Sequence, residues 1–171
     1  MFRARRYFAA LALTTAALGA TAALAAPAQA AGATARVVGG IVIIQGTTGN
    51  DSIDVVQSGN SVRISSVLHS VTSGGAPCVQ LGAVVSCPAT QLSVQARMGS
   101  GDDVVRVSST TIDTTLIGND GVDRLSGGSD RDFLDGGPGN DFLSGNAGVD
   151  SAQGGTGVDS CTAETEVNCE S

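Results

Sequence analysis

Residues 118–162 consist of five consecutive nine-residue segments, which read GNDGVDRLS, GGSDRDFLD, GGPGNDFLS, GNAGVDSAQ and GGTGVDSCT. The register never slips, and every segment begins with glycine. The sixth position is always an aspartate, at Asp123, Asp132, Asp141, Asp150 and Asp159. A fixed short period of this kind indicates a repeat architecture, in which each unit packs mainly against its neighbours.

Three further positions of the segment have restricted residue types. The second position holds glycine or asparagine, and the fourth holds glycine except at Asp130. Because glycine, asparagine and aspartate tolerate a left-handed backbone best, we expect φ above zero at both positions. The eighth position is predicted to face the interior, and its residues are Leu125, Leu134, Leu143, Ala152 and Cys161.

These segments resemble the glycine-rich nonapeptide of RTX, or haemolysin-type, calcium-binding proteins, whose pattern is G-G-x-G-x-D-x-U-x with U large and apolar. Residues 136–144 fit at every defined position, and residues 154–162 differ only in carrying cysteine at the apolar one. The resemblance implies an all-β fold, a right-handed parallel β-roll (β-solenoid) in which two nonapeptides, each with a six-residue turn and a three-residue strand, complete one coil. The chain is also similar in layout to short exported bacterial repeat proteins of actinomycete type.

In such a roll, each aspartate lies close to the aspartate one coil further along. Two carboxylates about 4 Å apart repel by about 4 kcal/mol at an effective dielectric of about 20, so the roll would resist closing without a cation. Hard oxygen donors from carboxylates and carbonyls favour Ca²⁺ over Mg²⁺, and we expect about three calcium ions, with room for one or two more at the ends of the roll. Their ligand pairs would be Asp123 with Asp141, Asp132 with Asp150, and Asp141 with Asp159. The alternative is that these polar turns need no metal.

Fragments of the same motif occur earlier in the chain. Asp103 and Val105 occupy the aspartate and apolar positions of one fragment, and Asp51 and Ile53 occupy those of another. Asp103 is a further candidate calcium ligand, although it precedes Asp123 by 20 residues, so the intervening segment must bulge or carry a degenerate turn. Asp51 is more isolated in the sequence.

Alternating, β-branched segments upstream of the repeats, such as residues 52–57 (SIDVVQ) and 61–67 (SVRISSV), predict further strands and no helix. We therefore divide the chain into three parts. Residues 1–31 are a signal peptide, residues 32–97 are a β-rich cap or a set of imperfect coils, and residues 98–171 are the calcium-binding roll with its own C-terminal cap.

Four cysteines in an exported chain suggest disulfides, and four cysteines allow three connectivities. Two local bridges are expected, because Cys78 is close in sequence to Cys87, and Cys161 is close to Cys169, whereas the two pairs are far apart. The first bridge would close a loop upstream of the repeats, and the second would close the last coil. A zinc site is the alternative, although the single histidine, His69, lies near neither pair and is expected on a surface loop.

The N-terminus reads as an export signal. Arg3, Arg5 and Arg6 precede the alanine- and leucine-rich residues 8–26, and residues 28–30 (AQA) fit a small-x-small cleavage site. We therefore expect the mature protein to be secreted and extracellular. An uncleaved membrane anchor and export by the twin-arginine route are the alternatives.

The charge of the chain limits its partners. It has 16 acidic and 9 basic residues and a formal net charge of −7, which loss of the arginine-rich N-terminus would make more negative. Nucleic acid and anionic membranes are therefore poor partners, and cations such as calcium are good ones. The sequence identifies no protein or cell-surface partner.

Catalysis is not expected. One histidine cannot build a Ser/His/Asp arrangement, and there is no HExxH motif or phosphate-binding loop. Paired aspartates can serve glycoside hydrolysis, but the turns already account for the acids. The sequence therefore predicts a secreted, non-catalytic protein that binds calcium and folds in response to it. The alternative is a matrix, adhesion or cell-surface interaction protein in which the roll is a scaffold and Phe133 and Phe142 point outward on opposite sheets.

Overall fold

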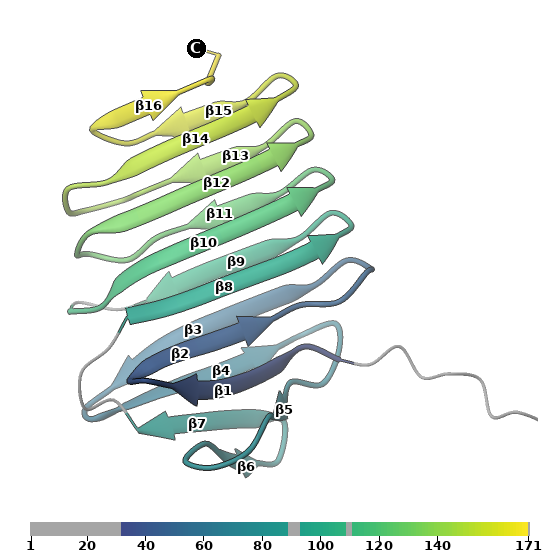
Figure 1. Cartoon of the computed structure of the whole chain (residues 1–171), viewed down its shortest axis with the longest axis vertical. Helices are drawn as coiled ribbons and strands as arrows, with labels where there is room; N and C mark the ends of the chain where they lie inside the picture. The colour runs from purple at the N-terminus through teal and green to yellow at the C-terminus, as the bar shows by residue number, and fades with distance from the viewer. Residues whose placement is uncertain (1–31, 89–92, 109–110, 171) are drawn as a thin grey trace, which may run out of the picture.

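The computed structural model describes residues 32–88, 93–108 and 111–170, and these residues form strands and connections without a helix. The strands make two eight-stranded sheets, stacked strand upon strand along the long axis of the molecule (Figure 1). The predicted all-β fold is confirmed. The predicted signal peptide lies outside the described residues, and within those residues no helix is long and apolar enough to cross a membrane.

The two sheets are named here by their strands. Sheet A has the order β16-β14-β12-β10-β8-β2-β1-β5. Its strands are β1 (Thr34–Val38), β2 (Ile41–Gln45), β5 (Thr72–Ser73), β8 (Ser93–Ser100), β10 (Asp113–Asp120), β12 (Asp132–Pro138), β14 (Ser151–Thr156) and β16 (Thr165–Val167). Sheet B has the order β15-β13-β11-β9-β3-β4-β7-β6. Its strands are β3 (Ser52–Ser58), β4 (Ser61–Ser66), β6 (Val79–Leu81), β7 (Val84–Pro88), β9 (Val104–Ser108), β11 (Arg124–Ser126), β13 (Phe142–Ser144) and β15 (Ser160–Thr162).

The repeat region winds back and forth between the two sheets. From β8 onward, successive strands alternate between sheets A and B, and neighbours within each sheet are parallel. Equivalent residues of alternate nonapeptides pair across one coil, as Leu125 does with Leu143 and Leu134 with Ala152. This path is consistent with the predicted β-roll of two nonapeptides per coil. Its right-handed winding stays a prediction.

Strand lengths differ between the two faces of the repeat region. In sheet B, β11, β13 and β15 have the expected 3 residues. In sheet A, β12 and β14 have 7 and 6 residues, because their pairing continues into the next turn, where Gly137 pairs with Gly155. The coil before the strict repeat is longer than the others, since Val105 pairs with Leu125 rather than with residue 123. The irregular coil predicted after Asp103 is therefore present.

The N-terminal region follows a different path. β1 pairs with β2, β3 with β4, and β7 with both β4 and β6, all antiparallel. β2 and β3 then pair in parallel with β8 and β9, so both sheets continue from these hairpins into the repeats. The sheets are therefore mixed, and the boundary predicted between residues 97 and 98 falls inside β8.

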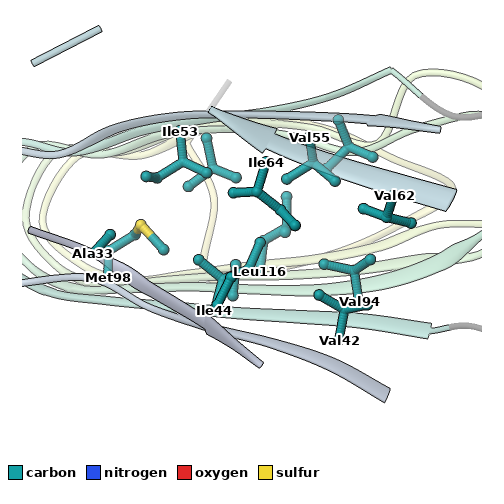
Figure 2. Close-up of a cluster of buried hydrophobic side chains, with 14 of the residues drawn as sticks. Ala33, Val42, Ile44, Ile53, Val55, Val62, Ile64, Val94, Met98 and Leu116 are labelled. Carbon is teal, nitrogen blue, oxygen red and sulfur yellow. The ribbon is translucent and has the colours of Figure 1, made fainter. Parts of the chain in front are cut away.

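The core is a single apolar layer between the two sheets. Figure 2 shows side chains of sheet B, such as Ile53 and Ile64, pointing toward side chains of sheet A, such as Ile44 and Leu116. All four are fully buried. The hairpin strands and the repeat strands therefore share one continuous core.

Each repeat strand contributes one side chain to this core, from the eighth position of its nonapeptide. The predicted inward-facing residues Leu125, Leu134, Leu143 and Ala152 are buried, whereas Cys161, in the last coil, is only half-buried. Full burial of one leucine side chain stabilises a fold by about 1.5–3 kcal/mol. A three-residue strand thus depends on its stacked neighbours for stability.

Both predicted local disulfides are present. Cys78, just before β6, is bonded to Cys87 in β7, and Cys161 in β15 is bonded to Cys169 after β16. Because all four thiols are used in disulfides, the alternative of a cysteine zinc site is wrong. His69 is exposed on a connection between strands, as predicted.

Candidate metal centre

A set of aspartates is buried at the turns of the two sheets, each directly before a strand or at its first residue. Their exposed fractions are 3% or less, although carboxylates in polar turns are normally solvated. They are Asp51, Asp103, Asp123, Asp132, Asp141, Asp150 and Asp159. Their burial requires partners for the carboxylate oxygens.

Five of these aspartates form what we call the first row: Asp51, Asp103, Asp123, Asp141 and Asp159. In every member after Asp51, one carboxylate oxygen reaches back one coil and accepts a hydrogen bond from the backbone N–H of the preceding member. The donor–acceptor distances are 2.6 Å from Asp51 to Asp103, 2.9 Å from Asp103 to Asp123, 2.8 Å from Asp123 to Asp141 and 2.9 Å from Asp141 to Asp159. The first row therefore runs the length of the repeat region and into the hairpins.

A second row lies at the opposite turns and contains Asp132 and Asp150. The Oδ1 atom of Asp150 accepts the N–H of Asp132 at 2.9 Å, and Oδ1 of Asp132 accepts the N–H of Thr114 at 3.0 Å. The Thr114 hydroxyl donates to the same Asp132 oxygen at 2.6 Å. Thr114 thus occupies the place of an aspartate in this row.

The remaining oxygen of most row carboxylates has no hydrogen-bond partner among the described residues. These buried atoms are Oδ1 of Asp51 and Oδ2 of Asp103, Asp123, Asp141, Asp150 and Asp159. A buried acceptor without a partner costs about 1–3 kcal/mol, and more when it is charged. The rows thus present a series of anionic oxygens that need an electropositive ligand.

Asp132 is the exception, because both of its oxygens are engaged. Its Oδ2 accepts the N–H of Gly128 at 2.6 Å. In the same turn, the N–H of Arg131 is accepted by the Asp130 side chain at 3.1 Å. The prediction of positive φ is wrong for Gly128 and Asp130 in this turn, because side-chain hydrogen bonds shape it in place of a left-handed backbone.

The other turns have the predicted left-handed backbone. At the second position, φ is 75° at both Asn119 and Asn146, and 105° and 112° at the two glycines Gly137 and Gly155. The glycines at the fourth position, Gly121, Gly139, Gly148 and Gly157, also have positive φ. These conformations explain why the second position holds only glycine or asparagine and why glycine predominates at the fourth.

Glycine at the first position is needed for space rather than for φ. A Cβ atom at Gly118 would collide with Oδ2 of Asp123 and the carbonyl oxygen of Gly136. A Cβ atom at Gly136 would collide in the same way with Oδ2 of Asp141 and the carbonyl of Gly154. The unpartnered carboxylate oxygen and a carbonyl of the next coil therefore border the same glycine-sized space.

Three carboxyl groups of the first row, those of Asp103, Asp123 and Asp141, have a pKa raised above the usual aspartate value. Burial raises the pKa of Asp103 from 3.8 to about 7 and the pKa of Asp123 to about 6. Repulsion from neighbouring carboxylates adds to both increases, while the accepted backbone hydrogen bonds oppose them. Burial also raises the pKa of Asp132 and Asp141. Without a cation, part of the row holds protons near neutral pH.

The donor set suits calcium. Ca²⁺ takes six to eight oxygen ligands in flexible geometry, including carboxylates, carbonyls and water. Within the described ranges, no three His, Cys, Asp or Glu side chains converge on one point. An ion at a row would therefore have few carboxylate ligands, and carbonyls such as those of Gly136 and Gly154 would complete the shell. Zinc, which prefers four nitrogen or sulfur ligands, does not fit.

The structure sorts the predicted site residues between the two rows. Asp103, Asp123, Asp141 and Asp159 lie in the first row, and Asp132 and Asp150 make up the second. Each of the three predicted ligand pairs is joined by a hydrogen bond across one coil. Their role as calcium ligands stays a prediction.

Asp51 is the row member that sequence reasoning left out of the site. It lies 52 residues before Asp103 in the sequence, because the strands from β4 to β7 intervene, yet its N–H donates to the Asp103 carboxylate. The motif fragment at residues 46–53 was the available signal. Only the pairing of β3 with β9 brings the two aspartates together.

Comparison with known families identifies the repeats. A model of the RTX calcium-binding nonapeptide repeat matches residues 43–54 and 117–152 in four copies. No curated protein and no solved structure matches the chain. The matched segments include Asp51 and four of the position-six aspartates, whereas Asp103 and Asp159 lie outside them and occupy equivalent places in the first row. The chain therefore carries RTX calcium-binding nonapeptide repeats, and these repeats imply that it binds calcium.

Proposed function

We propose that this protein is a secreted, non-catalytic calcium-binding protein whose roll closes when calcium binds. The observation that carries the proposal is the set of six buried carboxylate oxygens that have no hydrogen-bond partner. They lie at stacked turns of RTX repeats, where hard oxygen donors of adjacent coils meet. Parallel crossovers are right-handed in nearly all proteins, which supports a right-handed winding of the roll.

Calcium acts on folding because it binds only the closed roll. In the open chain the aspartates of a row are far apart. In the closed roll, aspartates of successive coils lie next to each other and are joined by hydrogen bonds. An ion that binds the folded state alone stabilises it by about 2.7 kcal/mol per site when its concentration is about 100 times Kd. For a thin core with one inward-facing apolar side chain per repeat strand, a few such sites decide whether the roll forms.

We propose that the roll binds about three ions. Their Kd values should be about 10⁻⁴ to 10⁻³ M, the range of calcium sites in extracellular modules. The pairs Asp123 with Asp141 and Asp141 with Asp159 each offer unpartnered oxygens from both members. The pair Asp132 with Asp150 offers an unpartnered oxygen only from Asp150, so we expect it to bind calcium most weakly.

Secretion and the absence of catalysis are part of the same proposal. Two disulfides are typical of proteins exported to an oxidising compartment, where calcium is also plentiful. The row carboxylates are buried and hydrogen-bonded to the backbone, which suits ion binding better than proton transfer to a substrate.

Calorimetric titration of the mature chain with calcium tests the proposal. We expect wild type to bind about three ions and Asp141→Ala to lose most of the heat, because Asp141 belongs to two pairs. Asp54→Ala is the control, since Asp54 lies outside the rows and its side chain is 37% exposed. Absence of binding heat in wild type up to several millimolar calcium contradicts the proposal.

A second candidate function is that of an interaction protein with the roll as scaffold. Phe133 on sheet A and Phe142 on sheet B are 39% and 48% exposed, as the outward direction of the seventh position predicts. The Arg124 guanidinium covers the Phe142 ring at 4.9 Å from its centre, beside a groove of about 360 Å³. Aromatic side chains are enriched at protein–protein interfaces.

The double variant Phe133→Ser, Phe142→Ser separates the two functions. If the roll serves as a contact surface, this variant loses binding to cell-wall material or self-association while its calcium titration stays that of wild type. If calcium binding is the whole function, neither measurement changes.

A further inference from the structure

The C-terminal cap, residues 163–170, is a compressed coil of the roll without the nonapeptide sequence. β16 pairs in parallel with β14, and Ser151 pairs with Thr165, which is four residues nearer than a regular coil would place its partner. The carbonyl of Asp159 accepts the N–H of Glu170 at 2.7 Å. In the repeats, the carbonyl of Asp141 accepts the N–H of Ser160 at 2.8 Å in the same way. The backbone of Glu170 therefore stands where the next strand of sheet B would begin.

The Glu170 side chain continues the first row. Its Oε2 atom accepts the N–H of Asp159 at 2.6 Å. Within the row, Oδ1 of Asp159 accepts the N–H of Asp141 at 2.9 Å. A glutamate from the cap thus replaces the aspartate that a further repeat would supply.

Asp159 has an oxygen that this contact does not satisfy. Its side chain is 1% exposed, and its Oδ2 atom accepts no hydrogen bond from the described residues. A Cβ atom at Gly154 would collide with the carbonyl oxygen of Asn168 and would lie 2.6 Å from Oδ2 of Asp159. At Gly136, the equivalent neighbours are the carbonyl of Gly154 and Oδ2 of Asp141. The cap therefore rebuilds the oxygen-lined space of a repeat from a different sequence.

The backbone of the cap supports this equivalence. Asn168 has φ of 52°, and the position-two residues Asn119 and Asn146 have φ of 75°. The disulfide between Cys161 and Cys169 joins β15 to the residue between Asn168 and Glu170. It holds the Asn168 carbonyl and the Glu170 carboxylate against the Asp159 turn.

We propose that Asp159, the Asn168 carbonyl and Glu170 form a terminal calcium site at the C-terminal end of the first row. The inference rests on the proposed function, since it takes calcium as the ion of the rows. It adds ligands that the nonapeptide pattern does not contain, and the family match ends before them, at residue 152. This site makes the cap an ion-binding part of the roll rather than an inert cover.

Nuclear magnetic resonance titration of the full chain with CaCl₂ tests the site, because it follows each amide separately. In wild type, the amides of Asn168 and Glu170 shift and saturate. In Glu170→Gln, which keeps an acceptor for the Asp159 N–H, we expect the apparent Kd at these amides to rise about tenfold or more, because the site loses one ligand charge. The amides of Gly118 and Gly136 should titrate as in wild type.

Glu166→Gln is the matched control, because Glu166 is in the same cap and hydrogen-bonds the Ala163 N–H outside the row. It should leave every apparent Kd unchanged. If Gly118 and Gly136 respond to calcium while the cap amides do not, or if Glu170→Gln matches Glu166→Gln, the terminal site is wrong and the proposed function stands. If no amide of wild type responds, the proposed function itself is wrong.

Crystals of wild type grown with MnCl₂ give a second measurement that does not depend on how the variants fold. We expect an anomalous peak beside Oδ2 of Asp159 and the Asn168 carbonyl. Peaks at the repeats without one at this position overturn the terminal site.

Discussion

The hairpin region and the repeat region share both sheets but are stabilised in different ways. Each of β2, β3 and β4 buries two β-branched side chains, as β2 does with Val42 and Ile44. Each of β11, β12 and β13 buries one leucine, such as Leu134 in β12. Of the buried carboxylate oxygens without a partner, the hairpin region contributes one, that of Asp51. The other five lie in or beside the repeats. A conventional core therefore supports one end of the molecule, and the other end depends on what neutralises its aspartates.

Calcium removal should have the largest effect, and it should destabilise the repeat region much more than the hairpin region. In excess EDTA, we expect amides of β11 and β13 to lose hydrogen-exchange protection by about a hundredfold, the equivalent of about 2.7 kcal/mol. Amides of β3 and β4 should keep most of their protection. Hydrogen exchange read by mass spectrometry measures both regions in one experiment. Uniform loss of protection over both regions would show that the hairpins depend on calcium as much as the repeats do.

Single substitutions of aspartates in the first row should differ in their effect on stability. Asp123→Asn should lower the free energy of unfolding in millimolar calcium by about 2–3 kcal/mol, because Asp123 has a neighbour on each side of the row. Asp51→Asn should cost less than about 1 kcal/mol, because Asp51 ends the row and its strand is held by a hairpin. Urea denaturation of both variants measures the difference, and equal losses would contradict the idea of a graded row.

Glycine substitutions test the space beside the carboxylates. Gly136→Ala should destabilise the protein by about 1–3 kcal/mol, because the new Cβ meets Oδ2 of Asp141 and a backbone carbonyl. Gly49→Ala is the matched control, since a Cβ there meets nothing within 4 Å and its φ is not in the left-handed region. Thermal unfolding in calcium measures the stability of the two variants. If Gly136→Ala is as stable as Gly49→Ala, glycine is not needed for space at position 136.

The smallest predicted effect is a pH dependence of the calcium-free protein. Burial holds the pKa of Asp103 near 7 and that of Asp123 near 6, above the unfolded value of 3.8. The folded state therefore binds more protons than the unfolded state between about pH 4 and pH 7, and its stability falls as pH rises through that window. Urea midpoints in EDTA should be higher at pH 5 than at pH 7.5. With calcium the trend should reverse, because protons then compete with the ion, and midpoints that do not change with pH in EDTA argue against buried, protonated aspartates.

The local part of this fold could be predicted from the sequence. The nine-residue register identified the inward-facing Leu125 and the outward-facing Phe142, because both follow from position within a repeat. The two disulfides followed from cysteines that are close in the sequence. Each of these features depends on residues fewer than ten apart or on one repeated unit.

The features that sequence reasoning missed depend on residues far apart or on a different residue type. The antiparallel hairpins have no repeat to mark their register, so residues 32–97 were predicted only as β-rich. Asp51 joins the row through a parallel pairing with β9 that no local pattern shows. Glu170 joins it because a longer side chain reaches across a compressed coil, where the pattern of glycine and aspartate is absent. The role of Asp51 is thus set by the path of the backbone, and that of Glu170 by the compressed coil together with the length of its side chain.

Circular dichroism of the mature chain in excess EDTA, followed by calcium addition, shows whether the roll needs a cation to close. We expect a β signal in EDTA that is weaker than in calcium, because the repeat strands open while the hairpins stay folded. The signal should rise steeply over millimolar calcium, with little response to magnesium at the same ionic strength. This result would mean that calcium binds the buried carboxylate oxygens and allows the roll to close. An equally strong β signal in EDTA and in calcium would contradict the account, since the rows would then close without a cation.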